Sequence, residues 1–198
     1  FAELDRLADT KNPAPFTFAG RKLTEKVNEA KNPSHLIAQF FAAWRNNGFI
    51  FPINPRIPNP PEISNGPPRS LLIYTSGSTA PPKIAVLSLS NLLANASTAI
   101  GPLDLRPGDQ WRLTLPFYHV GGIGIVIRCI LARATIVLDD SPHITHLSYV
   151  PTHLYRATPV YKHLRCLLLG GAPITSYPKH LPIYTTYGLT EMASMVAL

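Results

Sequence analysis

The chain has 198 residues, 45% hydrophobic and 15% charged, which is enough to bury one or two cores. Its net charge of +7 comes from scattered basic residues without interleaved aromatic side chains, so nucleic acid is not an expected partner. No run of about eighteen apolar residues occurs and no apolar leader follows Phe1, so neither a membrane span nor a secretory signal is expected. Cys129 and Cys166 lie in apolar runs without metal-ligand spacing, which is typical of buried, reduced thiols in a cytoplasmic protein.

The first third of the chain predicts one helix, one strand and a connector. Residues 34–47 have the apolar spacing of a helix, with Ser34 as candidate N-cap and Gly48 as the stop. Residues 49–51 then predict a strand. Residues 54–68 are rich in Pro, Asn and Gly, which indicates an exposed connector.

Strands and helices alternate in the rest of the chain. Strands are expected at residues 71–74, 111–115, 135–138, 146–150, 166–169 and 183–186. Helices are expected from near Ser90, at residues 122–132 and from Pro151. This alternation favours an α/β fold of layered sheets with helices on both faces. We expect residues 1–68 to form an N-terminal segment with its connector, and residues 69–198 to form a ligand-binding α/β core.

A loop rich in hydroxyl groups follows the strand at 71–74. It reads Tyr74-Thr75-Ser76-Gly77-Ser78-Thr79-Ala80-Pro81-Pro82-Lys83, and it offers backbone N–H groups, hydroxyls and one ammonium to a common point. These groups suit a polyphosphate. The loop does not fit G-x-x-x-x-G-K-[ST], because no glycine precedes Lys83 and Ile84 follows it. The alternative interpretation is a polar surface turn.

Three further motifs lie near strand ends, where α/β sheets collect ligands. They are Pro116-Phe117-Tyr118-His119, Gly170-Gly171-Ala172 and Tyr187-Gly188-Leu189-Thr190-Glu191. Each also has a structural interpretation: a packing histidine, a common turn, or a charge at a helix start. None of the three alone predicts a site.

Arg128 is a lone cation in an apolar helix, between Ile127 and Cys129. Burying an unpaired charge is costly, so an anionic partner is expected. The alternative is an arginine at the helix edge whose head reaches water.

Together these motifs resemble the signatures of the adenylate-forming superfamily, which includes acyl-CoA synthetases, luciferases and nonribosomal-peptide adenylation domains. The resemblance implies part of the N-terminal domain of an enzyme that activates a carboxylate with ATP and Mg²⁺ and then forms a CoA thioester. The chain departs from the pattern at Ala80, where the family normally has glycine. If that position needs positive φ, alanine adds strain and weakens phosphate binding.

The resemblance also implies roles for individual residues. The phosphate-binding residues would be Thr75, Ser76, Gly77, Ser78, Thr79 and Lys83. The adenine-binding residues would be Gly170, Gly171, Ala172, Tyr187 and Gly188. Thr190 would contact the α-phosphate and Glu191 would hold Mg²⁺, because like-charge repulsion between the acid and ATP must be neutralised. The expected catalytic residues are Lys83, His119, Thr190 and Glu191.

Three segments are similar to o-succinylbenzoate–CoA ligases of menaquinone biosynthesis. They are residues 115–122, residues 124–128 and residues 150–154. By this resemblance His119, Arg128, Ser148 and Ser194 would line the acid site, with Arg128 facing the acid groups of a small-molecule carboxylate. The open alternatives are another acyl or aryl acid, or a non-catalytic nucleotide-binding module.

Members of that family are about twice as long as this chain. Beyond Leu198 the resemblance implies an aspartate for the ribose, a hinge and a mobile lid domain with a catalytic lysine. We therefore expect the 198 residues alone to bind nucleotide weakly and to turn over slowly. The oligomeric state stays open, with a homo-oligomer among the alternatives.

Overall fold

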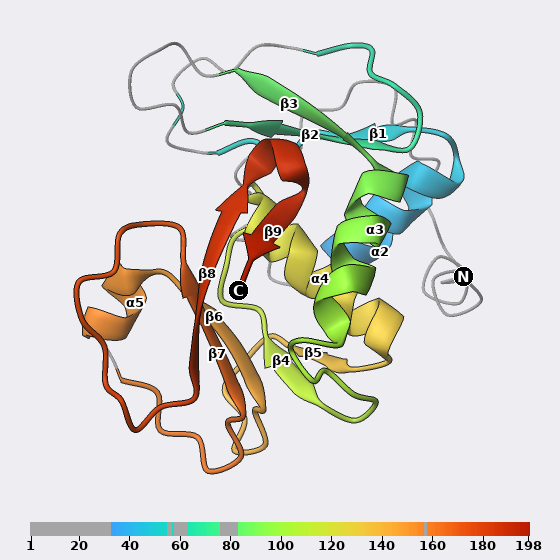
Figure 1. The fold of residues 1–198 in the computed structure, drawn as a ribbon. Helices are drawn as coiled ribbons and strands as arrows, with labels where there is room; N and C mark the ends of the chain where they lie inside the picture. Colours follow the sequence, from blue (N-terminus) through green and yellow to red (C-terminus); the bar gives the residue numbers. More distant parts are fainter. Residues whose placement is uncertain (1–32, 55–56, 58–62, 76–82, 157) are drawn as a thin grey trace.

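Two sheets and the helices around them make up the fold (Figure 1). The structure, a computed structural model, describes residues 33–54, 57, 63–75, 83–156 and 158–198, with side chains from residue 37 onward. The strands are β1 Phe49–Ile50, β2 Ser70–Tyr74, β3 Ile84–Ser88, β4 Gln110–Arg112, β5 Thr135–Val137, β6 His146–Tyr149, β7 Cys166–Gly170, β8 Ile183–Leu189 and β9 Ser194–Ala197. The helices are α2 Pro33–Arg45, α3 Leu89–Ile100, α4 Val120–Ala132, α5 Pro151–Arg156 and the 3-10 helix η2 Thr190–Met192.

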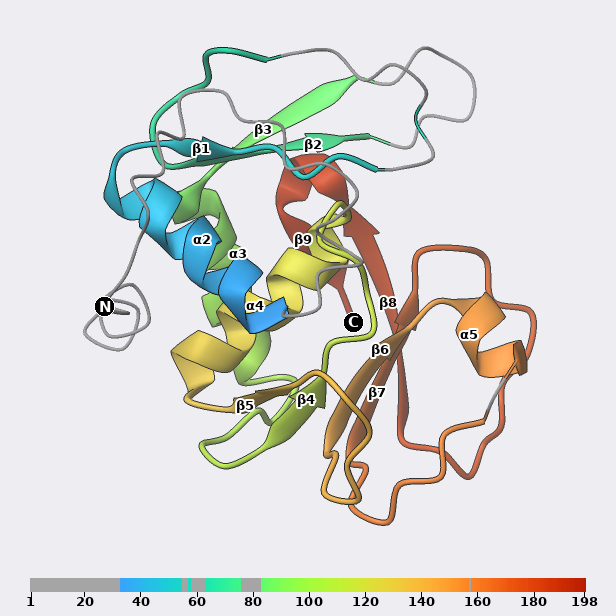
Figure 2. The same cartoon turned by 180° about the vertical axis from the view of Figure 1, so that it is seen from behind.

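The larger sheet has the order β5-β4-β6-β7-β8-β9, parallel except for β9. Helices α3 and α4 pack on the face that carries Trp111 and Leu168. Helix α5 packs on the opposite face, against Leu147 and Leu167. The front and back views place α3 and α4 on one side of this sheet and α5 on the other (Figures 1 and 2). The predicted layered α/β fold with helices on both faces is therefore confirmed.

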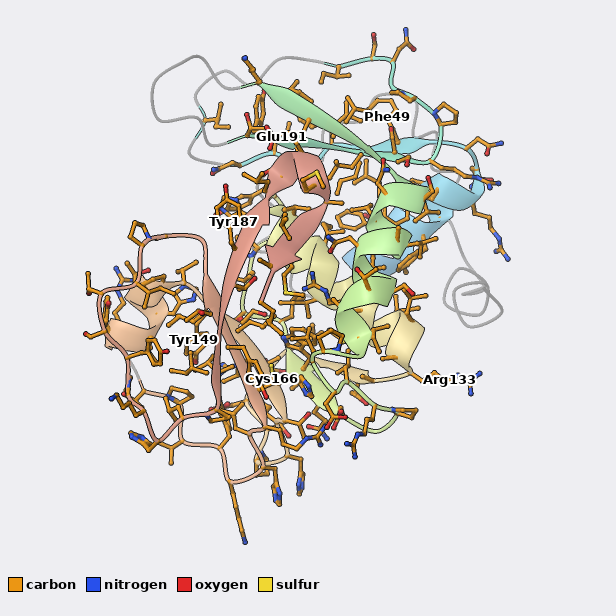
Figure 3. All side chains as sticks on the ribbon, in the orientation of Figure 1. Phe49, Arg133, Tyr149, Cys166, Tyr187 and Glu191 are labelled. Atoms are coloured by element: carbon orange, nitrogen blue, oxygen red, sulfur yellow. The ribbon has the colours of Figure 1, made fainter. Side chains whose placement is uncertain are left out.

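Both cysteines lie in the interior, as the sequence predicts. Cys129 of α4 and Cys166 of β7 are buried free thiols in the cluster that joins α3 and α4 to the larger sheet. Cys166 is labelled in Figure 3. Burial raises the pKa of each thiol to about 12, so both stay protonated at neutral pH. Among the described helices, none is both long and apolar enough to cross a bilayer.

Helix α2 ends in a Schellman motif. The N–H of Gly48 donates to the carbonyl of Ala43 at 2.7 Å, and the N–H of Asn47 donates to that of Trp44 at 3.2 Å. Asn47, with φ 55°, is the left-handed residue that stops the helix, whereas the sequence predicts Gly48 in that role. The predicted cap, Ser34, lies inside α2 and is not the N-cap.

The described residues before residue 68 pack into the same core as the residues that follow. Strand β1 pairs in parallel with β2, and the rings of Phe40 and Phe117 meet edge-on at 5.3 Å. Phe40 also shares its buried cluster with Ile73 and Ile127. The packing does not break at residue 68. The division into residues 1–68 and 69–198 therefore remains a proposal, which concerns where the ligand-binding groups lie.

Two strands are absent from the sequence prediction. Strand β3 pairs antiparallel with β2, and β9 pairs antiparallel with β8. Helix α3 also begins at Leu89, because Ser88 forms a capping box with Asn91, so the predicted start near Ser90 is one residue late. The predicted strands at residues 111–115, 135–138 and 146–150 end earlier, at residues 112, 137 and 149, while β8 runs on to Leu189.

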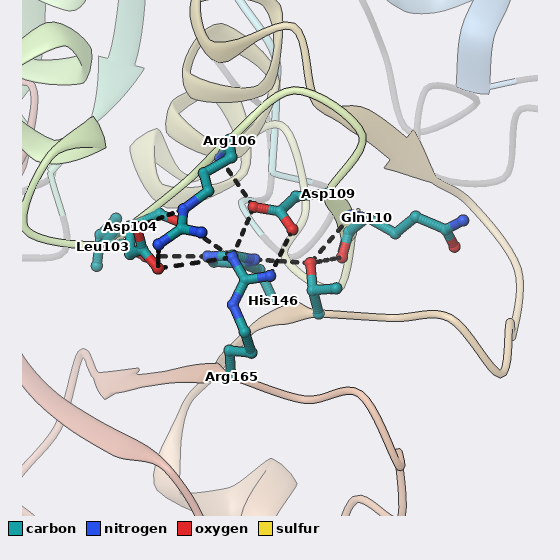
Figure 4. Close-up of polar contacts among 8 residues, drawn as sticks. Leu103, Asp104, Arg106, Asp109, Gln110, His146 and Arg165 are labelled. Carbon is teal, nitrogen blue, oxygen red and sulfur yellow. Dashed lines mark hydrogen bonds and ion pairs between the residues drawn. The ribbon is translucent and has the colours of Figure 1, made fainter.

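A polar network holds the end of the larger sheet where β4, β6 and β7 begin (Figure 4). Arg165 donates both terminal nitrogens to the carboxylate of Asp109 at 2.9 Å. Burial alone would raise the pKa of Asp109, but hydrogen bonds from Arg165 and from the N–H of Arg106 hold that pKa below its ordinary value. His146 is fully buried, and its Nε2 is 3.0 Å from the carbonyl of Leu103. Burial lowers the pKa of His146, so its ring stays neutral at pH 7.

The buried His146 predicts an acid-sensitive fold. Below its ordinary pKa of about 6.5, the unfolded chain binds a proton that the folded ring resists. The contribution to stability is therefore present above that pH and is lost as the pH falls toward the lower pKa of the folded state. As the pH falls from 7 toward the lower pKa of the folded ring, the free energy of unfolding should fall with a slope of at most about 1.4 kcal/mol per pH unit.

Urea denaturation of His146→Gln and of the exposed-site control His143→Gln tests this. The slope should shrink in His146→Gln and persist in His143→Gln. Equal slopes in the wild type and His146→Gln would contradict the assignment.

Candidate functional site

The hydroxyl-rich loop connects the two strands of a β-hairpin. Strands β2 and β3 pair up to Tyr74 and Ile84, and the N–H of Thr75 donates to the carbonyl of Lys83 at 2.8 Å. This bond closes the neck of the loop and brings Thr75 and Lys83 to one end of the hairpin. The predicted phosphate-binding residues Ser76, Gly77, Ser78 and Thr79, and also Ala80, lie outside the described residues.

The Tyr-Gly-x-Thr-Glu motif forms a second hairpin. Tyr187 and Gly188 belong to β8, and Thr190 and Glu191 form the start of η2. After η2 the chain turns through Ala193, with φ 62°, and Ser194, with φ 127°. Each left-handed residue other than glycine costs on the order of 1–3 kcal/mol, so the surrounding contacts must hold this turn in place.

The two hairpins lie side by side. The 3-10 helix η2 packs against β3, and both ribbon views place it directly beside the smaller sheet. Glu191 lies at this junction (Figure 3). Tyr187 lies below Glu191 in the same view and belongs to strand β8 of the larger sheet. Tyr187 is 60% exposed, which leaves its ring accessible to a flat ligand. The structure therefore brings the neck of the hydroxyl loop and the Thr-Glu turn into one region.

Gly170 and Gly171 lie at the end of β7, beside β8. Gly170 pairs with Thr186, and a Cβ on Gly170 would lie 2.4 Å from the carbonyl oxygen of Thr186. Gly171 has φ 80°, where other residues are strained. Ala172 follows as an exposed residue. The bare backbone of this turn therefore adjoins the strand that carries Tyr187.

Arg128 is buried, with 2% exposure, between α3, α4 and β9. Its Nη2 donates to Asn95 Oδ1 at 3.2 Å and to Ser194 Oγ at 3.3 Å, while its Nε has no partner. Burial lowers the pKa of Arg128 to about 10, so the guanidinium is still charged at neutral pH. Among the described residues, no carboxylate forms an ion pair with it. The interpretation of Arg128 as a surface arginine reaching water is therefore wrong.

The other predicted acid-site residues are arranged around Arg128 at different distances. Ser194 contacts the guanidinium directly and is 8% exposed. Ser148 of β6 is buried opposite Leu168, on the sheet face that α4 covers. His119 precedes α4 as its exposed N-cap residue, about 13 Å from Arg128 along the helix axis. The structure thus brings Arg128 and Ser194 into contact but does not place His119 beside them.

Two residues that lie near Arg128, Gly124 and Asn95, have no role predicted from the sequence. Gly124 lies one turn earlier on α4, where a Cβ would come 3.4 Å from Nη1 of Arg128. Asn95 contacts Arg128 from α3. One sequence signal could have indicated Asn95: it is a polar residue directly before Ala96, which belongs to the buried stripe of α3.

The close approach at Gly170 yields a prediction. Gly170→Ala should lower the free energy of unfolding by about 1–3 kcal/mol, because the methyl group overlaps the backbone of β8. Gly101→Ala is the matched control, since nothing lies within 4 Å of a Cβ there and φ is −61°. Guanidinium denaturation measures both, and equal stability of the two variants would contradict the packing at Gly170.

Known proteins that are similar to this chain point to one family. A model of the family "AMP-binding enzyme" matches residues 59–198. The 2-succinylbenzoate–CoA ligase of Salmonella typhimurium is 37% identical over 140 residues, which cover 63% of this chain and 31% of that protein. The ligase of the same name from Bacillus cytotoxicus is 30% identical over 172 residues, covering 68% and 36%. The chain thus spans about a third of the length of these curated relatives.

Solved structures are similar as well. A variant of E. coli MenE with bound OSB-AMS matches with a TM-score of 0.66 and 26% identity, over 82% of this chain and 48% of that chain. The o-succinylbenzoate coenzyme A synthetase (MenE) from Bacillus subtilis, in complex with ATP and magnesium ion, matches with a TM-score of 0.54 and 28% identity, over 63% and 31%.

Proposed function

The chain belongs to the AMP-binding enzyme family, and from that membership we propose that it contributes the nucleotide- and acid-binding part of an acid–CoA ligase. The reaction joins a carboxylate to the α-phosphate of ATP, which releases pyrophosphate and leaves an acyl-adenylate. The thiol of CoA then displaces AMP to form the thioester. The observation that carries the proposal is the meeting of the hydroxyl-loop hairpin with the Thr190–Glu191 turn.

The groups at this junction fit a magnesium nucleotide. Thr75 and Lys83 flank the loop at its closed neck and would hold the β- and γ-phosphates together with residues 76–79. Glu191 is an exposed carboxylate at the start of η2, a hard oxygen ligand of the kind that Mg²⁺ takes. Mg²⁺ takes one or two carboxylates plus phosphate oxygens, and the described residues contain no cluster of three or more metal-binding side chains. When bound, the ion would neutralise phosphate charge while Thr190 donates to the α-phosphate.

Adenine would lie between the backbone at Gly170–Gly171 and the ring of Tyr187. Gly171 is exposed at the end of β7, and Tyr187 offers an exposed aromatic face on the neighbouring strand. This places the base at the carboxyl ends of parallel strands, where α/β sheets bind ligands.

The acid would be a dicarboxylate, with o-succinylbenzoate as the first candidate because it appears in the names of the relatives. Arg128 supports this choice, since it is a buried cation with a free Nε and without a carboxylate partner among the residues that the structure describes. A neutral tail would leave that charge uncompensated. The buried free thiols fit a reducing cytoplasm.

A non-catalytic nucleotide-binding module is the second candidate. Ala80 favours it, because strain at a position where the family has glycine would weaken phosphate binding. The two candidates differ in acid-dependent chemistry. ATP–pyrophosphate exchange that requires o-succinylbenzoate supports the ligase, whereas nucleotide binding without any acid-dependent exchange supports the module.

The Mg²⁺ assignment is tested with Glu191→Gln. Mg·ATP should raise the melting temperature of the wild-type chain, because it binds the folded state alone. Loss of the carboxylate should weaken the apparent Mg²⁺ affinity in the presence of ATP by about 10-fold or more. Asp139→Asn removes the same charge from an exposed residue after β5 and should leave the affinity unchanged. Equal Mg²⁺ affinities for the wild type and Glu191→Gln would refute the role of Glu191.

The dicarboxylate assignment is tested with Arg128→Leu. Loss of a buried charge partner should weaken o-succinylbenzoate by about 100-fold, measured as Kd by calorimetry or as KM. Benzoate, with a single carboxylate, should lose much less. Arg133→Leu, at the exposed C-terminal end of the same helix, is the control and should bind both acids as the wild type does. Equal losses for the two acids would remove the specificity claim.

A further inference from the structure

The side-chain amide of Asn95 joins helix α3 to three other elements. Its Oδ1 accepts from Nη2 of Arg128 on α4 at 3.2 Å. Its Nδ2 donates to the carbonyl of Met192, at the end of η2, at 3.1 Å and to that of Met195, in β9, at 2.7 Å. Asn95 therefore lies between the acid site and the turn that carries Thr190 and Glu191.

Only one orientation of this amide satisfies its partners. The carbonyl oxygens of Met192 and Met195 need donors, so the NH₂ group must face them. The amide oxygen then faces the guanidinium of Arg128, which can only donate. A flipped amide would place its oxygen against two carbonyls and its NH₂ against a cation. The contacts therefore specify asparagine by both ends of its side chain.

The segment held by Asn95 is the strained part of the second hairpin. Met192 and Met195 bracket Ala193 and Ser194, which have φ 62° and 127°. Ser194 also accepts from Nη2 of Arg128 at 3.3 Å, so one nitrogen of the guanidinium contacts both the turn and the residue that clamps it. A shift of the guanidinium must therefore change the contacts on both sides of this turn.

We propose that Asn95 is a positioning residue that couples acid binding at Arg128 to the placement of the Thr190–Glu191 turn, so that the acid and Mg·ATP bind cooperatively. This rests on the proposed function. The two bonds of Nη2 are long, at 3.2 and 3.3 Å, and a bound carboxylate forms bonds of about 2.7–2.9 Å with a guanidinium. Acid binding thus changes the position that the guanidinium prefers. The planar amide of Asn95 transmits this change to the carbonyls of Met192 and Met195.

The coupling is reciprocal, as linkage requires. The acid favours the turn conformation that Asn95 holds, and Glu191 binds Mg·ATP best in that conformation. Each ligand therefore raises the affinity of the protein for the other by the same factor. Couplings of this kind are about 5–150-fold. We expect a factor of about 10 here.

The experiment measures the coupling factor with matched asparagine variants of α3. The Kd of o-succinylbenzoate is determined by calorimetry with and without Mg²⁺ and α,β-methylene-ATP, a nucleotide that cannot be cleaved at the reacting bond. Asn95→Ala should reduce the factor to within about 2-fold of unity. The control is Asn91→Ala, an exposed asparagine one turn earlier on the same side of α3. This change breaks the capping box and destabilises α3, but it leaves the contacts of Asn95 with the turn in place. This control should keep the wild-type factor.

A third variant keeps the oxygen of residue 95 and removes its donor. Asn95→Asp places a carboxylate against Arg128, which neutralises the guanidinium internally, and it loses the donor to both carbonyls. Acid affinity should fall in this variant, and the coupling factor should fall toward unity as in Asn95→Ala. A coupling factor at the wild-type level would contradict the role of the NH₂ group.

The outcomes separate this proposal from the proposed function. Wild-type coupling that persists in Asn95→Ala, or wild-type binding of both ligands without coupling, overturns the role of Asn95 and leaves the ligase intact. A wild type that binds neither ligand overturns both proposals. Amide hydrogen exchange separately tests whether Asn95 holds the turn through its bonds to Met192 and Met195. If it does, residues 190–195 exchange faster in Asn95→Ala than in Asn91→Ala. Equal exchange in the two variants would show that Asn95 does not hold the turn.

Discussion

The structure depends on a positive charge held inside it without a negative partner among the described residues. Arg128 has 2% exposure and contacts only neutral oxygens of Asn95 and Ser194. Such a group costs free energy that a leucine at the same place would not cost. The hydrogen bonds to Asn95 and Ser194 offset part of this cost. A buried cation that is only partly compensated supports the proposal that Arg128 binds an anionic ligand.

The same charge organises the hairpin of β8, η2 and β9. Its turn contains two consecutive residues with positive φ, and neither is glycine. Hydrogen bonds from Asn95 and Arg128 hold the turn from the side of α3 and α4, while η2 packs against β3 on its other side. The strained turn therefore lies between helices α3 and α4 on one side and strand β3 on the other, and it is supported from both. Strain of this kind persists only where the surrounding structure over-determines it, which is typical of functional sites.

The elements predicted from the sequence are those with a strong local signal. The apolar runs of α4 and β7 and the proline at the start of α5 were sufficient to place them within a few residues. Strands β3 and β9 are missing from the prediction because each exists through an antiparallel partner. The sequence marks Arg128 as a lone cation in an apolar helix. It does not mark Asn95, whose partners lie 33 to 100 residues away. Contacts that are distant in the sequence leave no pattern in a single chain.

Two arginines of this protein, Arg165 and Arg128, differ in whether a carboxylate among the described residues pairs with them. Arg165 donates two hydrogen bonds to the buried carboxylate of Asp109, and the pair anchors the end of the larger sheet where its strands begin. Each charge there has its partner within the fold, so that network needs no ligand. Arg128 lies inside the same protein with neutral partners and an orphaned Nε. Arg128 therefore keeps hydrogen-bonding capacity that Arg165 has already used, which supports the proposal that Arg128 binds an acid.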